Sequence, residues 1–109
     1  MNFTENDWVE AKLKFERVFG GGIEMDGILF LIGVQELGQG FKVFEKDEKM
    51  NLMHIAVCRL LEPMGYYTFS HKDDGWPHYI KSENLPGLSK KEQDKLLQES
   101  VIIYSRTEL

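Results

Sequence analysis

The chain has 109 residues, of which 42% are hydrophobic and 28% charged. This length and composition are typical of one globular domain, so we expect a single domain over residues 1–109 and exclude a disordered chain. The formal net charge of -5, with no basic run, argues against a nucleic-acid partner, since binding phosphates needs clustered Lys and Arg. The single cysteine, Cys58, excludes an internal disulfide.

The start of the chain and its most apolar stretch both predict a cytoplasmic protein. Residues 1–7 have neither the basic nor the apolar region of a signal peptide. The apolar run over 28–34 is much shorter than the roughly 20 residues that span a bilayer. We therefore expect no membrane partner and a location in the cytosol.

The first predicted element is a helix over residues 5–19. Thr4 and Asp7 have the spacing of a capping box, in which two side chains bind the free backbone N–H groups at a helix start. The three glycines at 20–22 would end this helix. Helical spacing predicts an inward face made by Trp8, Ala11, Phe15, Val18 and Phe19.

The second segment, 26–37, permits two interpretations. Its centre is apolar on every side, which fits a buried helix or a central strand. We favour a helix, because Asp26 is a good N-cap residue and Gly38 is suited to end it; a buried strand is the alternative. In the helical interpretation, Gly33 would let a neighbouring helix approach closely.

A third helix is predicted over 44–61, and Pro63 and Gly65 would end it. The mixed charges at 45–49 indicate a solvated helix start. Helical spacing gives an inward stripe of Met50, Met53, Val57 and Leu60, widened by Leu52, Ile55, Ala56 and Leu61.

A β-hairpin is predicted next. Residues 65–71 and 76–81 are rich in β-forming side chains, and the turn signal Asp-Asp-Gly at 73–75 lies between them. Because Pro77 has no backbone N–H to donate, the second strand should be an edge strand or leave that position unpaired.

The last predicted helix covers 90–104, after a capping box made by Ser89 and Glu92. Its inward residues would be Leu96, Leu97, Ser100, Val101 and Tyr104. The sequence thus predicts a mostly α domain of the α+β type, with about four helices around one core and a β-hairpin between the third and fourth.

The register of the hairpin decides which side chains share a face. A two-residue turn at 74–75 would place His71 opposite His78. A three-residue loop would instead pair Ser70 with His78 and move His71 away. In the first register, alternation places on one face Phe69, His71, Asp73, Trp76, His78 and Ile80.

Three of these side chains are potential metal ligands. His71 and His78 would lie opposite each other with Asp73 one step away, and two imidazoles and a carboxylate suit a divalent metal. The alternative is that exposed histidines and a turn aspartate have no ligand at all.

Aromatic residues of the hairpin could instead contact a partner. Tyr66, Tyr67, Trp76 and Tyr79 lie on or beside a predicted edge strand, and Tyr and Trp are enriched in interfaces. The alternative is that these rings cover the helical core.

His54 and Cys58 are spaced i,i+4 on the third predicted helix, as a metal-binding pair or a nucleophile and its base would be. Without a third partner, Cys58 is expected to be a small buried apolar residue. No motif of a catalytic site accompanies them, so we do not expect an enzyme.

The strings at 53–58, 65–67, 74–78 and 88–93 resemble those of a small family of uncharacterised bacterial proteins. The resemblance covers about half of the chain. It implies a bacterial, cytosolic origin and no mechanism.

The sequence therefore predicts a non-enzymatic protein-interaction or regulatory module without a cofactor. The alternative is a metal-binding protein or metal-dependent enzyme that uses His71, Asp73 and His78. We also expect a homodimer, because the apolar faces of the second and third helices exceed what a monomer of this size would cover.

Overall fold

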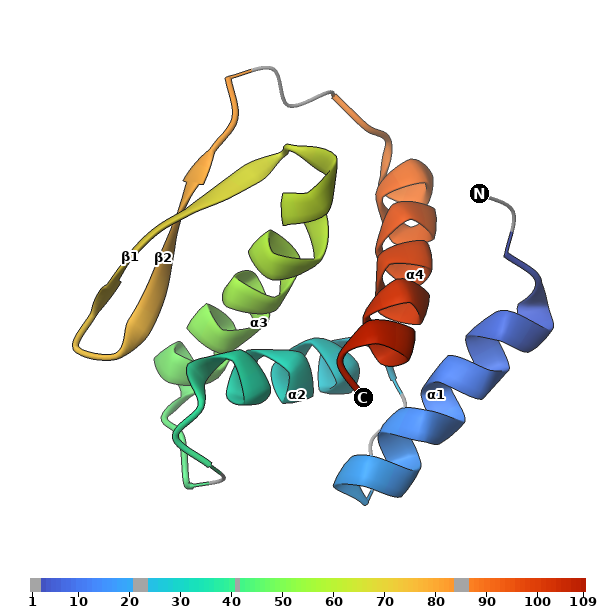
Figure 1. The fold of residues 1–109 in the computed structure, drawn as a ribbon, viewed down its shortest axis with the longest axis horizontal. Helices are drawn as coiled ribbons and strands as arrows, with labels where there is room; N and C mark the ends of the chain where they lie inside the picture. The colour runs from blue at the N-terminus through green and yellow to red at the C-terminus, as the bar shows by residue number, and fades with distance from the viewer. Residues whose placement is uncertain (1–2, 21–23, 41, 84–86) are drawn as a thin grey trace.

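The computed structural model describes residues 3–20, 24–40, 42–83 and 87–109. Within them the chain forms α1 (Glu5–Phe19), α2 (Met25–Leu37), α3 (Lys46–Leu61), the 3-10 helix η1 (Glu62–Met64), β1 (Tyr67–Asp73), β2 (Trp76–Lys81) and α4 (Lys90–Thr107). The two strands form an antiparallel hairpin between α3 and α4 (Figure 1). The predicted α+β fold of four helices and a hairpin is confirmed.

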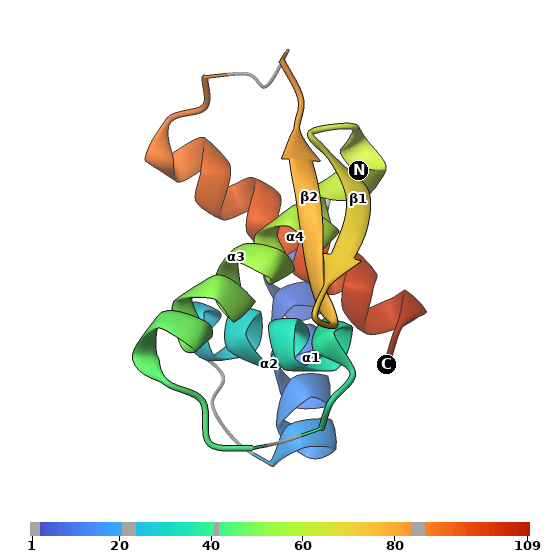
Figure 2. The same cartoon turned by 90° about the vertical axis from the view of Figure 1, so that its left-hand side faces the viewer.

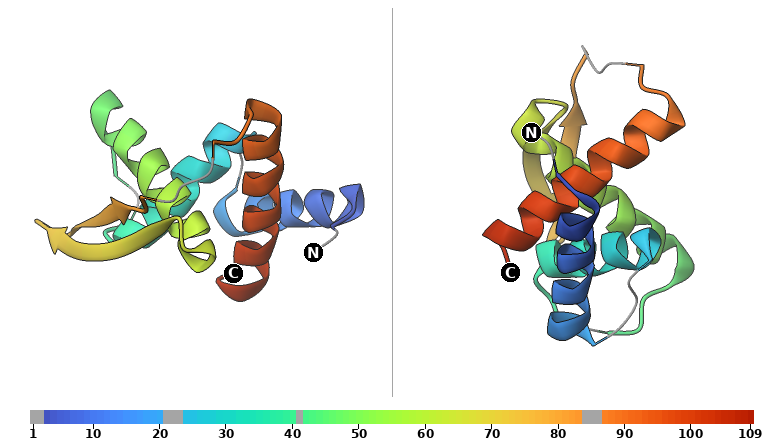
Figure 3. Two further views of the ribbon diagram at one scale, coloured as in Figure 1. Left: turned by 90° about the horizontal axis from the view of Figure 1, so that it is seen from above. Right: turned by 90° about the vertical axis from the view of Figure 1, so that its right-hand side faces the viewer.

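The hairpin lies at one side of the molecule and α1 at the other, with α2, α3 and α4 between them (Figure 3). α2 packs closely on α3, and the hairpin lies on α3 and reaches α2 (Figure 2). α4 lies between α3 and α1 (Figure 1). No helix in the described part of the chain is long and apolar enough to cross a lipid bilayer.

α1 has the predicted bounds and cap. The backbone N–H of Thr4 donates to Asp7 Oδ2 at 2.7 Å, and the Asp7 N–H donates to Thr4 Oγ1 at 3.2 Å. The Thr4 N–H holds the pKa of Asp7 below its ordinary value. Trp8, Ala11 and Phe15 are buried as predicted, whereas Val18 is 54% exposed, because the last turn of α1 extends past α4 (Figure 1).

The segment over 26–37 is a helix, so the alternative of a buried strand is wrong. It begins one residue earlier than predicted, with Glu24 rather than Asp26 at the N-cap. The residues buried in it point to every side of the helix; they are Ile28, Leu29, Leu31, Ile32, Gly33, Val34 and Leu37. Its neighbours inside the monomer therefore cover the apolar surface that suggested a dimer.

Gly33 allows the close approach of α2 and α3. A Cβ atom at this position would lie 2.9 Å from Leu52 Cα and nearer still to the Leu52 carbonyl group. Glycine is thus required by the separation of two backbones, as the sequence predicted.

α3 begins two residues later than predicted, with Glu45 as N-cap and Phe44 buried in the core before it. The predicted stripe is wrong at Met50, which is 63% exposed. Leu60 of that stripe is buried, and Met53 and Val57 are half-buried. The other buried residues of α3 are Leu52, Ile55, Ala56 and Cys58. Because α2 packs against the side of α3 that carries Leu52, the residues expected only to widen the face form its centre.

Of the two turns that the sequence permits, the hairpin has the two-residue turn. His71 pairs with His78, and Asp73 pairs with Trp76. The turn residues at 74–75 both have positive φ, 56° and 86°, as a type I′ turn requires. The three-residue loop is excluded.

Beyond His71 the predicted pairing is wrong. The register shifts at Ser70, so that Phe69 pairs with Tyr79 rather than Ile80. A bulge adds one residue to β1 and thereby moves Phe69 to the opposite face of the hairpin. Pro77 lies in β2, which is an edge strand as predicted, and is itself buried.

α4 begins as predicted, with the capping box of Ser89 and Glu92. It continues three residues beyond the predicted end and buries Ser100, Val101, Ile102, Tyr104 and Ser105. Leu96 and Leu97, predicted to be inward, are only half-buried. The main core lies where α4 meets α1, α2 and α3, and a smaller cluster lies under the hairpin.

Candidate functional site

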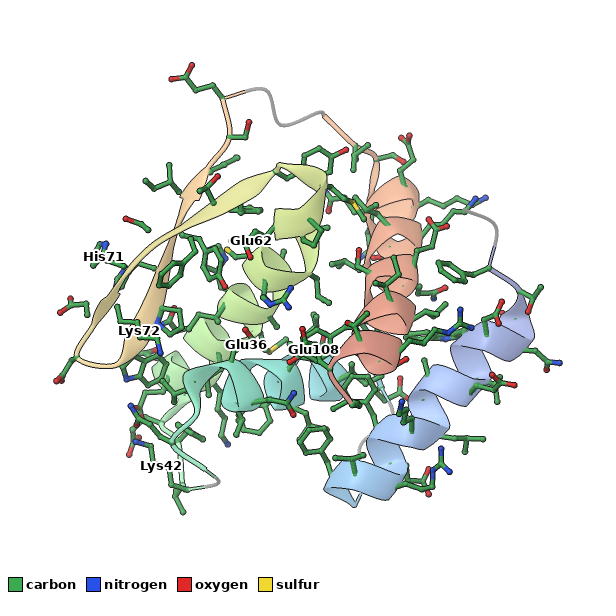
Figure 4. The ribbon with its side chains drawn as sticks, viewed as in Figure 1. Glu36, Lys42, Glu62, His71, Lys72 and Glu108 are labelled. Atoms are coloured by element: carbon green, nitrogen blue, oxygen red, sulfur yellow. The ribbon has the colours of Figure 1, made fainter. Side chains whose placement is uncertain are left out.

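The potential metal ligands lie together on the outer face of the hairpin. The rings of His71 and His78 are parallel, with centroids 5.0 Å apart. Asp73 Oδ2 lies 3.9 Å from His78 Nε2, and Ser70 Oγ lies 2.9 Å from His71 Nδ1. These side chains are exposed, and His71 lies well away from the helices (Figure 4).

Their geometry gives the metal hypothesis no support. Among the described residues, no group of three or more His, Cys, Asp or Glu side chains is placed to hold a metal ion. Lone pairs of two parallel rings lie in parallel planes and do not converge on one point, as tetrahedral coordination requires. A metal site at His71, Asp73 and His78 stays a prediction, which metal analysis of the purified protein would test.

The four predicted partner-binding aromatics do not form one surface. Trp76 contacts the buried Phe44 edge-on, with centroids 6.5 Å apart, and packs against the smaller core cluster. Tyr79 contacts Phe69 at 5.8 Å, on the inner face of the hairpin. Tyr66 and Tyr67 lie elsewhere and line a pocket. The alternative interpretation, that aromatics cover the core, thus fits Trp76.

This pocket, here called the tyrosine pocket, lies between the end of α3, the start of the hairpin and the start of α4. It encloses about 150 Å³. Its lining residues are Val57, Leu61, Tyr66, Tyr67, Leu88, Gln93, Leu96 and Leu97. All except the exposed Gln93 are half-buried, and burial raises the pKa of Tyr67.

A polar network joins α2, α3 and α4 around Arg59. Arg59 forms ion pairs with Glu36 at 3.3 Å and with Glu108 at 2.7 Å. The Tyr104 hydroxyl donates to Glu36 Oε2 at 2.8 Å and accepts from Gln35 Nε2 at 3.1 Å. Burial, and then the bond to the Glu36 carboxylate, raise the pKa of Tyr104. The network fixes Arg59 relative to three helices.

Negative charge exceeds positive charge around this network. Glu62 follows the end of α3, where its Oε2 atom accepts from the Phe69 N–H at 3.2 Å (Figure 4). Burial first, and then the charges of Glu62 and Glu36, raise the pKa of Tyr79 to about 12. Two carboxylates, of Glu36 and Glu108, therefore pair with the Arg59 guanidinium, and a third, of Glu62, acts with that of Glu36 on the neighbouring Tyr79.

Beside the network lies an apolar groove of about 190 Å³ between α3, η1 and α4, here called the α3–α4 groove. Its lining residues are Arg59, Leu60, Pro63, Met64, Ser100, Ile103, Tyr104 and Thr107. Met64 on η1 and Ile103 on α4 remain 38% and 37% exposed. The groove thus combines an apolar lining with a charged end.

A wider depression of about 510 Å³ lies between α1 and α4. Its lining includes charged side chains of both signs, among them Glu10, Lys14 and Arg17, and the ion pair of Asp7 with Arg106 at 2.8 Å. Such paired, solvated charges favour a surface in water rather than a specific site.

The pair of His54 and Cys58 is present but is not built for catalysis. Cys58 Sγ lies 3.5 Å from His54 Nε2, and Cys58 is 1% exposed. Burial raises the pKa of Cys58 to about 11. A nucleophilic cysteine needs a lowered pKa and access to its substrate, so the expectation of a buried apolar residue is confirmed.

We expect Cys58 in the native protein to react with a thiol reagent at pH 8 at least about a hundredfold more slowly than in the chain unfolded in urea, because both burial and the raised pKa suppress the thiolate. Absorbance of the released thiolate of Ellman's reagent measures both rates. Equal rates would show an accessible, activated thiol and restore the nucleophile hypothesis.

Sequence reasoning found Tyr66 and Tyr67 but missed the Arg59 network. Its members come from three helices, and no local pattern connects Glu36, Arg59 and Tyr104. The one signal in the sequence was Glu36, a charged residue near the end of the apolar segment. A carboxylate on a buried helix needs a partner of opposite charge. No family model, no curated protein and no solved structure matches this chain.

Proposed function

We propose that this chain is a non-enzymatic protein-interaction module that binds a segment of a partner protein in the α3–α4 groove. One observation carries the proposal: the apolar side chains of Met64 and Ile103 stand partly exposed on facing walls of a groove that also contains Leu60 and Pro63. Protein interfaces characteristically have an apolar centre and a polar rim. The groove and its charged end have this composition.

The charged end indicates the chemistry of the partner. Glu36, Glu62 and Glu108 provide three negative charges against the one positive charge of Arg59. A segment that carries Lys or Arg beside an apolar side chain complements this arrangement. The net charge of -5 on the whole chain would further attract a basic partner.

A different protein suits the groove better than a second copy of this chain. The expected homodimer rests on apolar surface of α2 and α3, and the structure buries much of it within the monomer, for example at Ile28, Ile32 and Leu52. Two copies in contact through the groove would also bring the same excess of carboxylates together. Following the resemblance to bacterial proteins, we place this interaction in the bacterial cytosol.

Selection of random peptides on the purified chain tests the proposal. We expect the selected peptides to combine an aliphatic or aromatic residue with Lys or Arg, and to bind with dissociation constants in the micromolar range. Ile103→Glu should weaken their binding about tenfold or more, because it places a charge in the apolar part of the groove. The matched control is Val43→Glu, at a position that is 96% exposed and lines neither cavity.

The proposal is overturned by selected peptides that lack basic residues or that bind the Ile103→Glu variant as tightly as the original chain. It is equally overturned if light scattering shows a mass twice the 12.7 kDa of the chain and Ile103→Glu abolishes this dimer. The groove would then belong to a second copy.

A further inference from the structure

We infer that the tyrosine pocket binds one uncharged aromatic ring, the side chain of a Phe or Tyr residue of the partner protein. The source of the ring rests on the proposed function. The pocket itself is separate from the α3–α4 groove, with which it shares no lining residue.

The volume of the pocket matches a single ring. It encloses about 150 Å³. A cavity of about this volume in the apolar core of another protein binds one benzene molecule. The pocket is thus large enough for a phenyl or phenol ring and too small for two rings.

The lining selects an uncharged occupant. None of the eight lining residues is charged, and five of them are the aliphatic residues Val57, Leu61, Leu88, Leu96 and Leu97. A cation or carboxylate would lose its hydration here without gaining an opposite charge. Gln93 is the exposed polar residue of the lining, and its amide can bond the hydroxyl of a tyrosine.

The aromatic wall of the pocket is held in place before any ligand binds. The Tyr66 carbonyl accepts from the Ser82 N–H at 2.9 Å, which ties the start of β1 to the end of β2. The Tyr67 ring contacts His54 of α3 edge-on, with centroids 6.3 Å apart. Binding to a preformed wall avoids the loss of side-chain entropy that ordering it would cost.

The pocket and the groove are neighbours along α4. Leu96 lines the pocket and Ser100 lines the groove, one helical turn later. On α3 the adjacent residues Leu61 and Leu60 line the pocket and the groove respectively. A protein bound in the groove is therefore close enough to place a second side chain in the pocket.

The pocket can be tested with small probes that need no partner. The full chain, labelled with ¹⁵N, is titrated with p-cresol, the side-chain analogue of tyrosine, and separately with n-butylammonium, the analogue of lysine. We expect p-cresol to shift the amide signals of Leu61, Gln93 and Leu97 saturably, with a dissociation constant of about 1 mM. n-Butylammonium should leave these signals unchanged.

Two variants each fill the pocket with a tryptophan side chain, one from α4 and one from the segment before it. Because they change different parts of the chain, loss of binding in both is not explained by one local folding defect. Leu97→Trp and Leu88→Trp should each abolish the p-cresol shifts while thermal unfolding remains cooperative. The matched control, Val43→Trp, changes a position that is 96% exposed and lines neither cavity, and should bind p-cresol as the original chain does.

The inference is overturned if p-cresol causes no saturable shift, if n-butylammonium binds equally well, or if both filled variants bind p-cresol unchanged. If peptide selection fails while p-cresol still binds, the proposed function of the groove is wrong and the inference about the ring-binding pocket stands. If p-cresol binds but the selected peptides tolerate replacement of every aromatic residue by alanine, the ring belongs to a free small molecule and a protein source is excluded.

Discussion

Replacement of Gly33 by alanine is expected to lower the free energy of unfolding by about 3 kcal/mol, the upper part of the range for overpacked sites. The added methyl group would overlap the backbone of Leu52, where no side-chain rotation can relieve the contact. α2 and α3 would have to separate, and Ile32 and Leu52, both fully buried, would lose packing. The better helix propensity of alanine offsets only about 1 kcal/mol of this loss.

Urea unfolding followed by circular dichroism measures the effect. Gly87→Ala is the matched control, because a Cβ atom at Gly87 meets no atom within 4 Å and its φ lies outside the left-handed region. Its unfolding midpoint should stay close to that of the original chain. A Gly33→Ala midpoint equally unchanged would show that the two helices are not held at the distance described.

Phe15→Ala is expected to lower the free energy of unfolding by about 4 kcal/mol, as truncation of a buried phenylalanine does. The Phe15 side chain is fully buried, stacks on Phe19 at 5.9 Å and belongs to the main core. Its removal leaves a cavity that the surrounding helices cannot close without breaking other contacts.

Val18→Ala provides the comparison on the same helix, since Val18 is 54% exposed. Its effect should stay within about 0.5 kcal/mol, as for other surface positions. The sequence predicted that Phe15 and Val18 both face inward. Urea unfolding of the two variants shows which of the two positions is buried. Equal losses would contradict the exposure of the last turn of α1.

The starts of α1 and α4 were predictable because the causes of their caps are local. The boxes made by Thr4 with Asp7, and by Ser89 with Glu92, use residues three apart, so α1 and α4 begin where the sequence indicates. The turn over 74–75 follows in the same way from two residues that tolerate positive φ.

Positions that depend on neighbouring elements were not predictable to the same degree. Met50 and Leu52 are equally apolar, and only the approach of α2 decides that Leu52 is buried. The bulge at Ser70 adds a residue to β1, but no glycine or turn residue in the sequence indicates it. For this reason the predicted partner of Phe69 was wrong.

The candidate site shows the same division. Tyr66 and Tyr67 were recognised as aromatic residues beside an edge strand, but their pocket is completed by Leu88, Leu96 and Leu97, which the hairpin alone does not indicate. The Arg59 network depends on Glu36 and Tyr104 meeting across three helices, at a sequence separation of 68 residues. Such a pair leaves no pattern along the chain.

The packing of α1 against α4 has a consequence for folding during synthesis on the ribosome. α1 packs mainly against α4, and Arg106 reaches back 99 residues to Asp7. During synthesis, Trp8 and Phe15 of α1 leave the ribosome long before α4, which provides most of the surface that covers them. A contact of this span makes closure slow and joins both ends of the chain in one cooperative step. We therefore expect the emergence of α4 from the ribosome to set the time at which α1 docks.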